Sequence, residues 1–269
     1  MKELVLLTGK DGFIGTALSV RLEQLGYKVI GFKHDDYVWD IPKLKPDYIF
    51  HLASFGNHYN QTDEEEIFET NIGLTFNIME AVKHMPLKGF INFSTSGHVL
   101  ECDSFYGATK MAGEYLARAF VKKYNIPIVN IRPYSVYGPG EADFRFIPTI
   151  IRKGIKGEEI EVTEGVHDWI YIDDFITGVI TVMDNVGTLK GQSIDIGTGG
   201  QYSNEDVLEI LSQWLPDLKI KHIDKKRSYD TLAEWKANTE KIASLGVFRT
   251  FNLEEGLKKT YDWYKERLV

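Results

Sequence analysis

The 269-residue chain is 43% hydrophobic and 26% charged, a composition typical of globular proteins that excludes a disordered or low-complexity chain. Its formal net charge of −8 makes nucleic acid and anionic membrane surfaces unsuitable as general partners. The single cysteine, Cys102, excludes an internal disulfide and is typical of a reducing cytoplasm, and no stretch is apolar enough for a membrane span. We therefore expect a cytoplasmic protein that binds neither nucleic acid nor membranes.

The first thirty residues predict a strand, a glycine turn, a helix and a second strand. Residues 4–7 form an uninterrupted apolar run, as in a central strand of a parallel sheet, and residues 29–32 form another. Between them come the glycines of the turn and apolar residues at helical spacing: Gly9, Gly12 and Gly15, then Ile14, Leu18, Leu22 and Leu25. Such a turn lets backbone amides at a helix N-terminus approach a pyrophosphate, and the alternative is a tight turn without a ligand.

Later apolar runs alternate with helical patterns. They occupy residues 48–52, 90–93, 128–131 and 193–196. This alternation predicts an α/β fold with a Rossmann-like, doubly wound parallel sheet. Because residues 33–47 are few and contain Pro42 and Pro46, we expect the second crossover to lack a full helix.

One long helix is predicted to begin at Asp63, which with Glu66 resembles a capping box, and to run as far as Val82. Beyond residue 137 the pattern changes to short helical stretches, an isolated strand and a final amphipathic helix. The strand is expected at residues 159–162 and the helix near residues 253–267.

Two domains are expected from this change of pattern. Residues 1–137 form a dinucleotide-binding domain, to which residues 168–198 return. Residues 138–269 form mainly a smaller, C-terminal substrate-binding lobe.

Tyr106 and Lys110 are four residues apart and therefore share one face of a helix, with Ser104 available to cap its start. An ammonium group beside a phenol favours the phenolate, which suits an acid/base catalyst. Ser96 follows a predicted strand, at the edge where open sheets place active sites. The alternative for Ser96 is a hydroxyl bonded to the neighbouring backbone.

Seven motifs resemble, in the same order, those of the extended short-chain dehydrogenase/reductase superfamily. They are TGKDGFIG at 8–15, HLAS at 51–54, NIGLT at 71–75, FSTS at 93–96, YGATK at 106–110, IRPYSVYGPG at 131–140 and DWIYIDD at 168–174. Within this superfamily the chain resembles the NAD-dependent epimerase/dehydratase family, whose members act on nucleotide sugars.

The resemblance implies an NAD or NADP cofactor across the glycine turn, with Tyr106 as acid/base, Lys110 on the nicotinamide ribose and Ser96 on the reacting oxygen. The cofactor-binding residues that it implies are Gly9, Gly12, Phe13, Ile14, Gly15, Lys33, His34, Asp40, Ile41, Leu52, Ala53, Ser54, Asn71, Tyr106, Lys110 and Tyr134. It also implies a homodimer formed through helices of the dinucleotide domain.

Departures from the family pattern bear on the cofactor. Lys33 and His34 stand where an acidic residue would bind the ribose of NAD, and a cation there suits the 2′-phosphate of NADP, which we favour. Asp35 or Asp36 turned toward the ribose is one alternative, and an exposed loop of mixed charge is another.

His98 stands where relatives keep auxiliary catalytic groups. Dehydratases and decarboxylases of the family have an acidic residue two positions after the strand-end hydroxyl, where this chain has His98, and fucose-synthase-like enzymes have a cysteine there. His98 is a candidate base for a carbon next to a ketone, and a structural or solvated histidine is the alternative.

Substrate binding also departs from the pattern. Ser135 replaces an asparagine and His167 an arginine, which weakens the expected diphosphate site, while Arg227 matches a late arginine of the family or belongs to a solvated charge run. The histidine spacings are not those of zinc sites, so no metal is expected.

The leading hypothesis is an NAD(P)-dependent nucleotide-sugar epimerase that oxidises a sugar carbon, C4, transiently, with Tyr106 as acid/base. The first alternative is an NADPH-dependent ketosugar reductase, with His98 assisting epimerisation. A non-catalytic dinucleotide-binding regulator is the alternative from another class.

Overall fold

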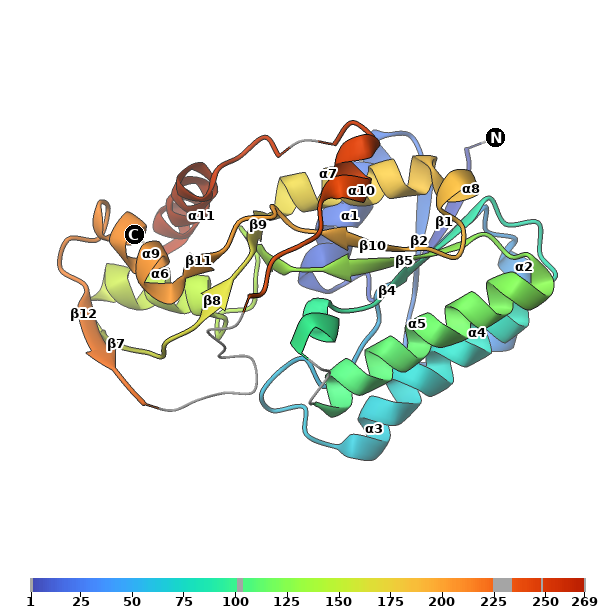
Figure 1. Ribbon diagram of the computed structural model, residues 1–269, viewed down its shortest axis with the longest axis horizontal. Helices are drawn as coiled ribbons and strands as arrows, with labels where there is room; N and C mark the ends of the chain where they lie inside the picture. The colour runs from blue at the N-terminus through green and yellow to red at the C-terminus, as the bar shows by residue number, and fades with distance from the viewer. Residues whose placement is uncertain (1, 101–103, 225–233, 248, 269) are drawn as a thin grey trace. The chain divides into compact units, whose positions relative to one another are not determined.

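The computed structural model describes residues 2–100, 104–224, 234–247 and 249–268. The chain divides into two compact units. Figure 1 labels the helices and strands of both. Unit 1 comprises Met1–Pro133 and Ile176–Ile196, and unit 2 comprises Tyr134–Phe175 and Gly197–Val269.

Within the described residues, unit 1 contains one parallel sheet of six strands in the order β10-β5-β4-β3-β1-β2. The strands are β1 (Leu4–Thr8), β2 (Lys28–Phe32), β3 (Tyr48–His51), β4 (Gly89–Phe93), β5 (Ile128–Pro133) and β10 (Ser193–Ile196). Because β2 and β3 flank β1, the crossovers after β1 and β3 run in opposite directions, and open sheets bind ligands at such a switch point. The predicted Rossmann-like α/β fold is confirmed.

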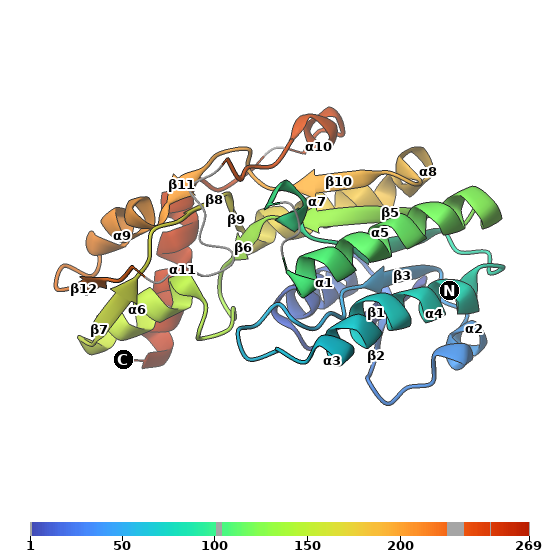
Figure 2. The same cartoon turned by 60° about the horizontal axis from the view of Figure 1, so that its bottom comes forward.

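Helices cover both faces of this sheet. The helices of unit 1 are α1 (Phe13–Gln24), α2 (Ile41–Leu44), α3 (Glu64–Phe68), α4 (Thr75–Val82), α5 (Phe105–Tyr124), α7 (Ile172–Asp184), whose first residues belong to unit 2, and α8 (Val186–Leu189). Helices α4 and α5 lie side by side on one face and α1 lies on the other (Figures 1 and 2). None of the described helices is long and apolar enough to cross a lipid bilayer.

The second crossover lacks a full helix, as predicted. A 3₁₀ turn at Val38–Asp40 leads into the four residues of α2, and Lys45 then adopts a left-handed conformation with a φ of 52°. This residue ends α2 directly before Pro46, which cannot donate to a continuing helix.

The helix predicted from Asp63 to Val82 is interrupted. Asp63 does cap α3, because its Oδ1 accepts a hydrogen bond from the Glu66 amide at 3.0 Å, but a π-helical turn at Glu69–Leu74 separates α3 from α4. Such turns are rare and occur often at functional sites. This one contains Asn71, which the family resemblance implies at the cofactor.

Unit 2 is built from short elements. They are β6 (Ser135–Tyr137), α6 (Phe146–Lys156), β7 (Glu159–Val162), β8 (Val166–His167), β9 (Trp169–Tyr171), β11 (Tyr202–Ser203), α9 (Asn204–Ser212), β12 (Lys219–His222), α10 (Glu240–Ser244) and α11 (Leu253–Leu268). The strands pair as β6 with β9, β8 with β11 and β7 with β12. The strand and the final helix expected in this region are present.

Buried Asp168 holds three segments of unit 2 together. Its carboxylate accepts hydrogen bonds from the Thr198 amide and hydroxyl, both at 2.7 Å, and from the amides of Gly199 and Ala237, both at 2.9 Å. A carboxylate with this many donors is fully occupied, so Asp168 has a structural role.

Candidate active site

The glycine turn after β1 is too tightly packed for side chains. Gly9 has a φ of +68°, and a Cβ there would lie 3.0 Å from the Ala53 amide nitrogen. A Cβ on Gly15 would lie 2.1 Å from the Gly9 carbonyl oxygen. Only glycine fits these positions, so the start of α1 approaches the loop after β3 closely.

The N-terminus of α1 fits a diphosphate. Gly12 is the N-cap without a side-chain bond, and the first turn contains no acidic residue. The free amides and the helix dipole therefore favour an anion beside Phe13 and Ile14. The residues present thus match the dinucleotide that the sequence predicts.

Other predicted cofactor residues follow the carboxyl ends of β2 and β3. Lys33 and His34 are exposed after β2, and the Lys33 amide donates to Asp36 Oδ2 at 2.7 Å, which occupies that carboxylate. Asp40 is exposed, whereas Ile41 is fully buried in the core. Leu52, Ala53 and Ser54 follow β3 and are partly buried.

A chain of buried hydrogen bonds connects the ends of β1 and β3 with α4. Thr8 Oγ1 lies 2.8 Å from His51 Nδ1, and His51 Nε2 lies 2.8 Å from Thr75 Oγ1. The Thr75 hydroxyl donates to the Asn71 carbonyl at 2.8 Å, so it must accept from His51, whose proton is therefore on Nε2. Burial, together with the smaller effect of the Lys110 charge, lowers the pKa of His51 to about 3. The imidazole is thus neutral.

The same relay reaches helix α5 through the Asn71 side chain. Asn71 Nδ2 donates to the Phe55 carbonyl at 2.8 Å and to Thr109 Oγ1 at 3.0 Å, and its Oδ1 accepts from the Phe55 amide at 3.0 Å. Thr109 precedes Lys110 in α5. We call the set Thr8, His51, Thr75, Asn71 and Thr109 the neutral relay.

Ser96 and His98 lie in a 3₁₀ turn, Ser96–Leu100, directly after β4. The Gly97 amide donates to Thr95 Oγ1 at 3.0 Å. The hydroxyl that bonds to the neighbouring backbone is therefore that of Thr95, and not that of Ser96. Ser96 is buried, and its hydroxyl has no hydrogen bond to any residue that the structure describes. It is available to a ligand.

Tyr106 and Lys110 lie one turn apart near the start of α5, which Ser104 caps by accepting from the Gly107 amide at 3.0 Å. Tyr106 is half-buried. Lys110 is only 4% exposed, and no acidic side chain among the described residues pairs with it. Burial lowers its pKa to about 8. This uncompensated cation favours the ionised form of a nearby phenol.

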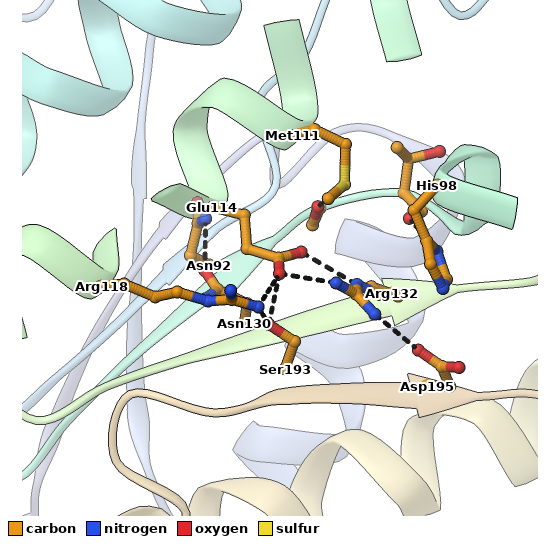
Figure 3. A network of polar contacts seen from close by, with 11 residues as sticks. Asn92, His98, Met111, Glu114, Arg118, Asn130, Arg132, Ser193 and Asp195 are labelled. Carbon is orange, nitrogen blue, oxygen red and sulfur yellow. Dashed lines mark hydrogen bonds and ion pairs between the residues drawn. The ribbon is translucent and has the colours of Figure 1, made fainter. Parts of the chain in front are cut away.

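A second network, formed by side chains of α5, β5 and β10, is charged (Figure 3). Glu114 accepts from Arg132 Nε at 2.9 Å and Nη2 at 2.7 Å, from Arg118 Nη2 at 2.6 Å and from Ser193 Oγ at 2.5 Å. Arg132 Nη1 also lies 3.6 Å from Asp195 Oδ1. We call Glu114, Arg118, Arg132, Ser193 and Asp195 the charged network.

In unit 2, two of the three predicted substrate residues are in contact. Ser135 Oγ lies 3.2 Å from His167 Nδ1, and the imidazole centroid is 4.7 Å from that of Trp169 and 5.0 Å from that of Trp235. Tyr134 is buried beside them in the chain. Arg227, like Cys102, lies outside the described residues.

The sequence interpretation missed most of both networks. The signal for Glu114 was present, because Tyr106, Lys110 and Glu114 recur every four residues and so share a helix face. Thr8 and Thr75 were visible only as hydroxyl residues inside motifs.

Comparison with protein families identifies this architecture. A family model described as "NAD dependent epimerase/dehydratase family" matches residues 5–197. The chain belongs to this family. The predicted family is confirmed, and with it the prediction that the protein is an enzyme.

Three relatives of this family member are distant in sequence but are matched over almost their whole length. CDP-abequose synthase of Salmonella muenchen is 26% identical over 290 residues, which cover 95% of this chain and 96% of the relative. A crystal structure of UDP-glucuronic acid 4-epimerase from Bacillus cereus with NAD is 26% identical, with a TM-score of 0.83 over 98% of this chain and 96% of that chain. MoeE5 in complex with UDP-glucose and NAD shares the fold with a TM-score of 0.88 over 98% of this chain and 99% of that chain, at 24% identity.

Proposed function

We propose that this family member is a nucleotide-sugar epimerase that oxidises C4 of the sugar transiently and reduces it again from the other face. The observation that carries the proposal is Lys110, a buried cation without a carboxylate partner among the described residues, one helical turn from Tyr106. A buried charge of this kind is costly and is typical of a functional site.

Tyr106 acts as the acid/base in this proposal. Its phenolate, favoured by Lys110, removes the proton from the sugar hydroxyl, and the phenol returns it after the sugar has turned over. The free hydroxyl of Ser96 donates a hydrogen bond to the reacting oxygen. These two residues and Lys110 are the proposed catalytic groups.

The cofactor is held by the glycine turn and the N-terminus of α1, with Asp40, the loop at 52–54 and Asn71 along its length. When bound, its nicotinamide supplies the hydride acceptor and donor. NAD is the cofactor in the solved relatives. Lys33 favours NADP, because a cation after β2 suits its 2′-phosphate. Lys10 favours NADP for the same reason, since its side chain packs against Gly31 of β2. The Nζ of Lys10 also lies 4.0 Å from Glu23 Oε1.

The substrate proposed is a nucleoside diphosphate sugar bound by Tyr134, Ser135 and His167 of unit 2, together with Arg227. Structural relatives were solved with UDP-glucuronic acid and with UDP-glucose, and another relative is a CDP-sugar synthase. Ser135 and His167 supply a hydroxyl and an imidazole where an arginine would supply a bidentate guanidinium, so this chain depends more on Arg227 for its diphosphate contact.

A ketosugar reductase remains the second candidate, because a basic residue follows β2 and His98 lies in the same turn as Ser96. In that version NADPH is taken up from solution, Tyr106 supplies the proton and His98 serves as a base beside the ketone. The third candidate is a dinucleotide-binding regulator without catalysis. The free Ser96 hydroxyl near α5, the helix that contains Lys110, argues against this candidate.

Two experiments test the proposal. The purified protein is denatured and the released small molecules are identified by mass spectrometry: retained NAD supports an epimerase, whereas an empty site that takes up NADPH supports the reductase. Tyr106→Phe is then expected to lose about 10²- to 10⁴-fold in turnover with the fold intact, while Tyr115→Phe, an exposed tyrosine on the same helix, keeps full activity. Retained turnover in Tyr106→Phe would refute the assignment.

We further propose a homodimer through α4 and α5. Phe76 on α4 is 41% exposed and Tyr115 on α5 is 63% exposed, and the two helices lie side by side. Exposed aromatic residues on adjacent helices are typical of an interface. Light scattering on Phe76→Lys and Tyr115→Lys is expected to show a monomer, and a wild-type monomer would contradict the proposal.

A further inference from the structure

The surroundings of His98 are unusual for a half-buried histidine. Its Nδ1 lies 3.4 Å from the Thr95 carbonyl oxygen, a long and weak contact. Three charged groups act on the imidazole from three different elements: Arg132 from β5, Asp195 from β10 and Glu114 from α5. All three belong to the charged network, and Figure 3 shows His98 at its edge.

The members of the charged network differ in how tightly they are hydrogen-bonded. Glu114 is 1% exposed and accepts from two arginines and a serine, so its charge is compensated several times over. Arg132 directs Nε and Nη2 to Glu114, which leaves Nη1 to face Asp195 at the longer distance of 3.6 Å. The side chain of Asp195 is 11% exposed. Asp195 therefore forms the looser contact, on the side of Arg132 that Glu114 does not hold.

We propose that Asp195 is a positioning residue for His98, acting through Arg132: it orients the free end of the guanidinium and balances its charge at the imidazole. Burial lowers the pKa of His98 most, the Arg132 charge lowers it further, and Asp195 opposes that effect, as do the Thr95 carbonyl and Glu114. Of these opposing groups, Asp195 has the largest effect on His98. The inference rests on the proposed function only where turnover is measured.

The test compares Asp195→Asn, which removes the charge and keeps the shape, with Ser193→Ala on the same strand. Ser193 contacts Glu114, so its loss perturbs the charged network without removing the Asp195 charge. The imidazole of His98 is titrated by NMR in each variant, with His98→Gln to assign its signal. We expect the pKa of His98 to fall in Asp195→Asn and to stay unchanged in Ser193→Ala.

Asp195→Glu keeps the charge and is expected to keep the pKa of His98 close to that of the wild type. If Asp195→Asn does not fold, this variant still tests the inference, because a clearly shifted pKa in Asp195→Glu would contradict it. An unchanged pKa in Asp195→Asn, or equal shifts in Asp195→Asn and Ser193→Ala, would overturn the inference. The pH profile of turnover then separates the two proposals. If the pKa falls and the profile does not follow it, Asp195 positions His98 but His98 is not a catalytic base.

Discussion

Lys110, a buried residue of α5, and Arg132, which contacts α5 and has 16% of its side chain exposed, are two cations with opposite surroundings. Arg132 is bonded to both oxygens of Glu114 and faces Asp195, and although burial alone would lower its pKa, the hydrogen bond and charge of Glu114 raise it. Lys110 has no carboxylate partner among the described residues, and burial lowers its pKa to about 8. Its charge acts on His51 of the neutral relay, and Thr109 of the same relay precedes it in α5.

The difference separates a structural charge from a functional one. A buried ion pair with saturated hydrogen bonds costs little while it is intact and fixes the position of its partners. An unpaired buried cation costs free energy in every folded molecule and is kept where chemistry needs it. We therefore infer that the charged network stabilises the fold, which agrees with the proposed catalytic role of Lys110, and that the neutral relay holds the helix of Lys110.

The largest effect is expected from breaking the ion pair. Glu114→Gln leaves Arg132 with Asp195 alone, and removing one partner of a buried pair costs about 3–5 kcal/mol. Urea unfolding measures the loss. Glu23→Gln, at an exposed carboxylate 4.0 Å from Lys10, is the matched control and is expected to change stability by less than about 1 kcal/mol. Equal losses would mean that Glu114 is not structural.

Removing the Lys110 cation is expected to increase the stability of the fold, whereas breaking the Glu114 ion pair decreases it. Below pH 8 Lys110 is charged in both the folded and the unfolded chain, and its lowered pKa represents a folding penalty of about 3 kcal/mol. Lys110→Met removes this penalty, so it raises stability at pH 7 while it abolishes turnover. Between pH 8 and 10.5 the unfolded wild type binds more protons, so wild-type stability rises and the gain disappears. A destabilised Lys110→Met at pH 7 would contradict the account.

The neutral relay is expected to give an intermediate effect. Thr75→Val keeps the shape of the side chain but leaves His51 Nε2–H without a partner and removes a hydrogen bond to the Asn71 carbonyl, which costs about 1–3 kcal/mol. Thr75→Ser keeps the hydroxyl and serves as the control. Thermal unfolding measures both, and equal stability of Thr75→Val and Thr75→Ser would show that the hydroxyl is not needed.

The smallest effect is expected at the edge of the charged network. Arg118 donates to Glu114, but its side chain is 42% exposed, so solvent screens the pair. Arg118→Gln is expected to lose less than about 1 kcal/mol in urea unfolding and to leave turnover unchanged. A loss as large as that of Glu114→Gln would place Arg118 with Arg132 in the structural pair.

The strands of unit 1 were predictable because each contains apolar residues in a short run, and β1, β3 and β4 are buried over almost their whole length. The interruption before α4 was not, because it depends on Asn71 meeting Phe55 and Thr109, which lie far away in sequence. Ser135 and His167 were recognised separately as departures from the family. Their contact follows from the folding of unit 2, which no local pattern reports.

The most direct test of the central claim is to follow deuterium at C4 of the sugar, with UDP-glucose and UDP-glucuronic acid as substrates and no cofactor added. Transient oxidation with internal return of the hydride predicts an epimerised product that retains the deuterium and is formed by Tyr115→Phe but not by Tyr106→Phe. No epimerised product from either sugar, together with oxidation of NADPH when a nucleoside diphosphate 4-ketosugar is supplied, would contradict an epimerase and favour the reductase.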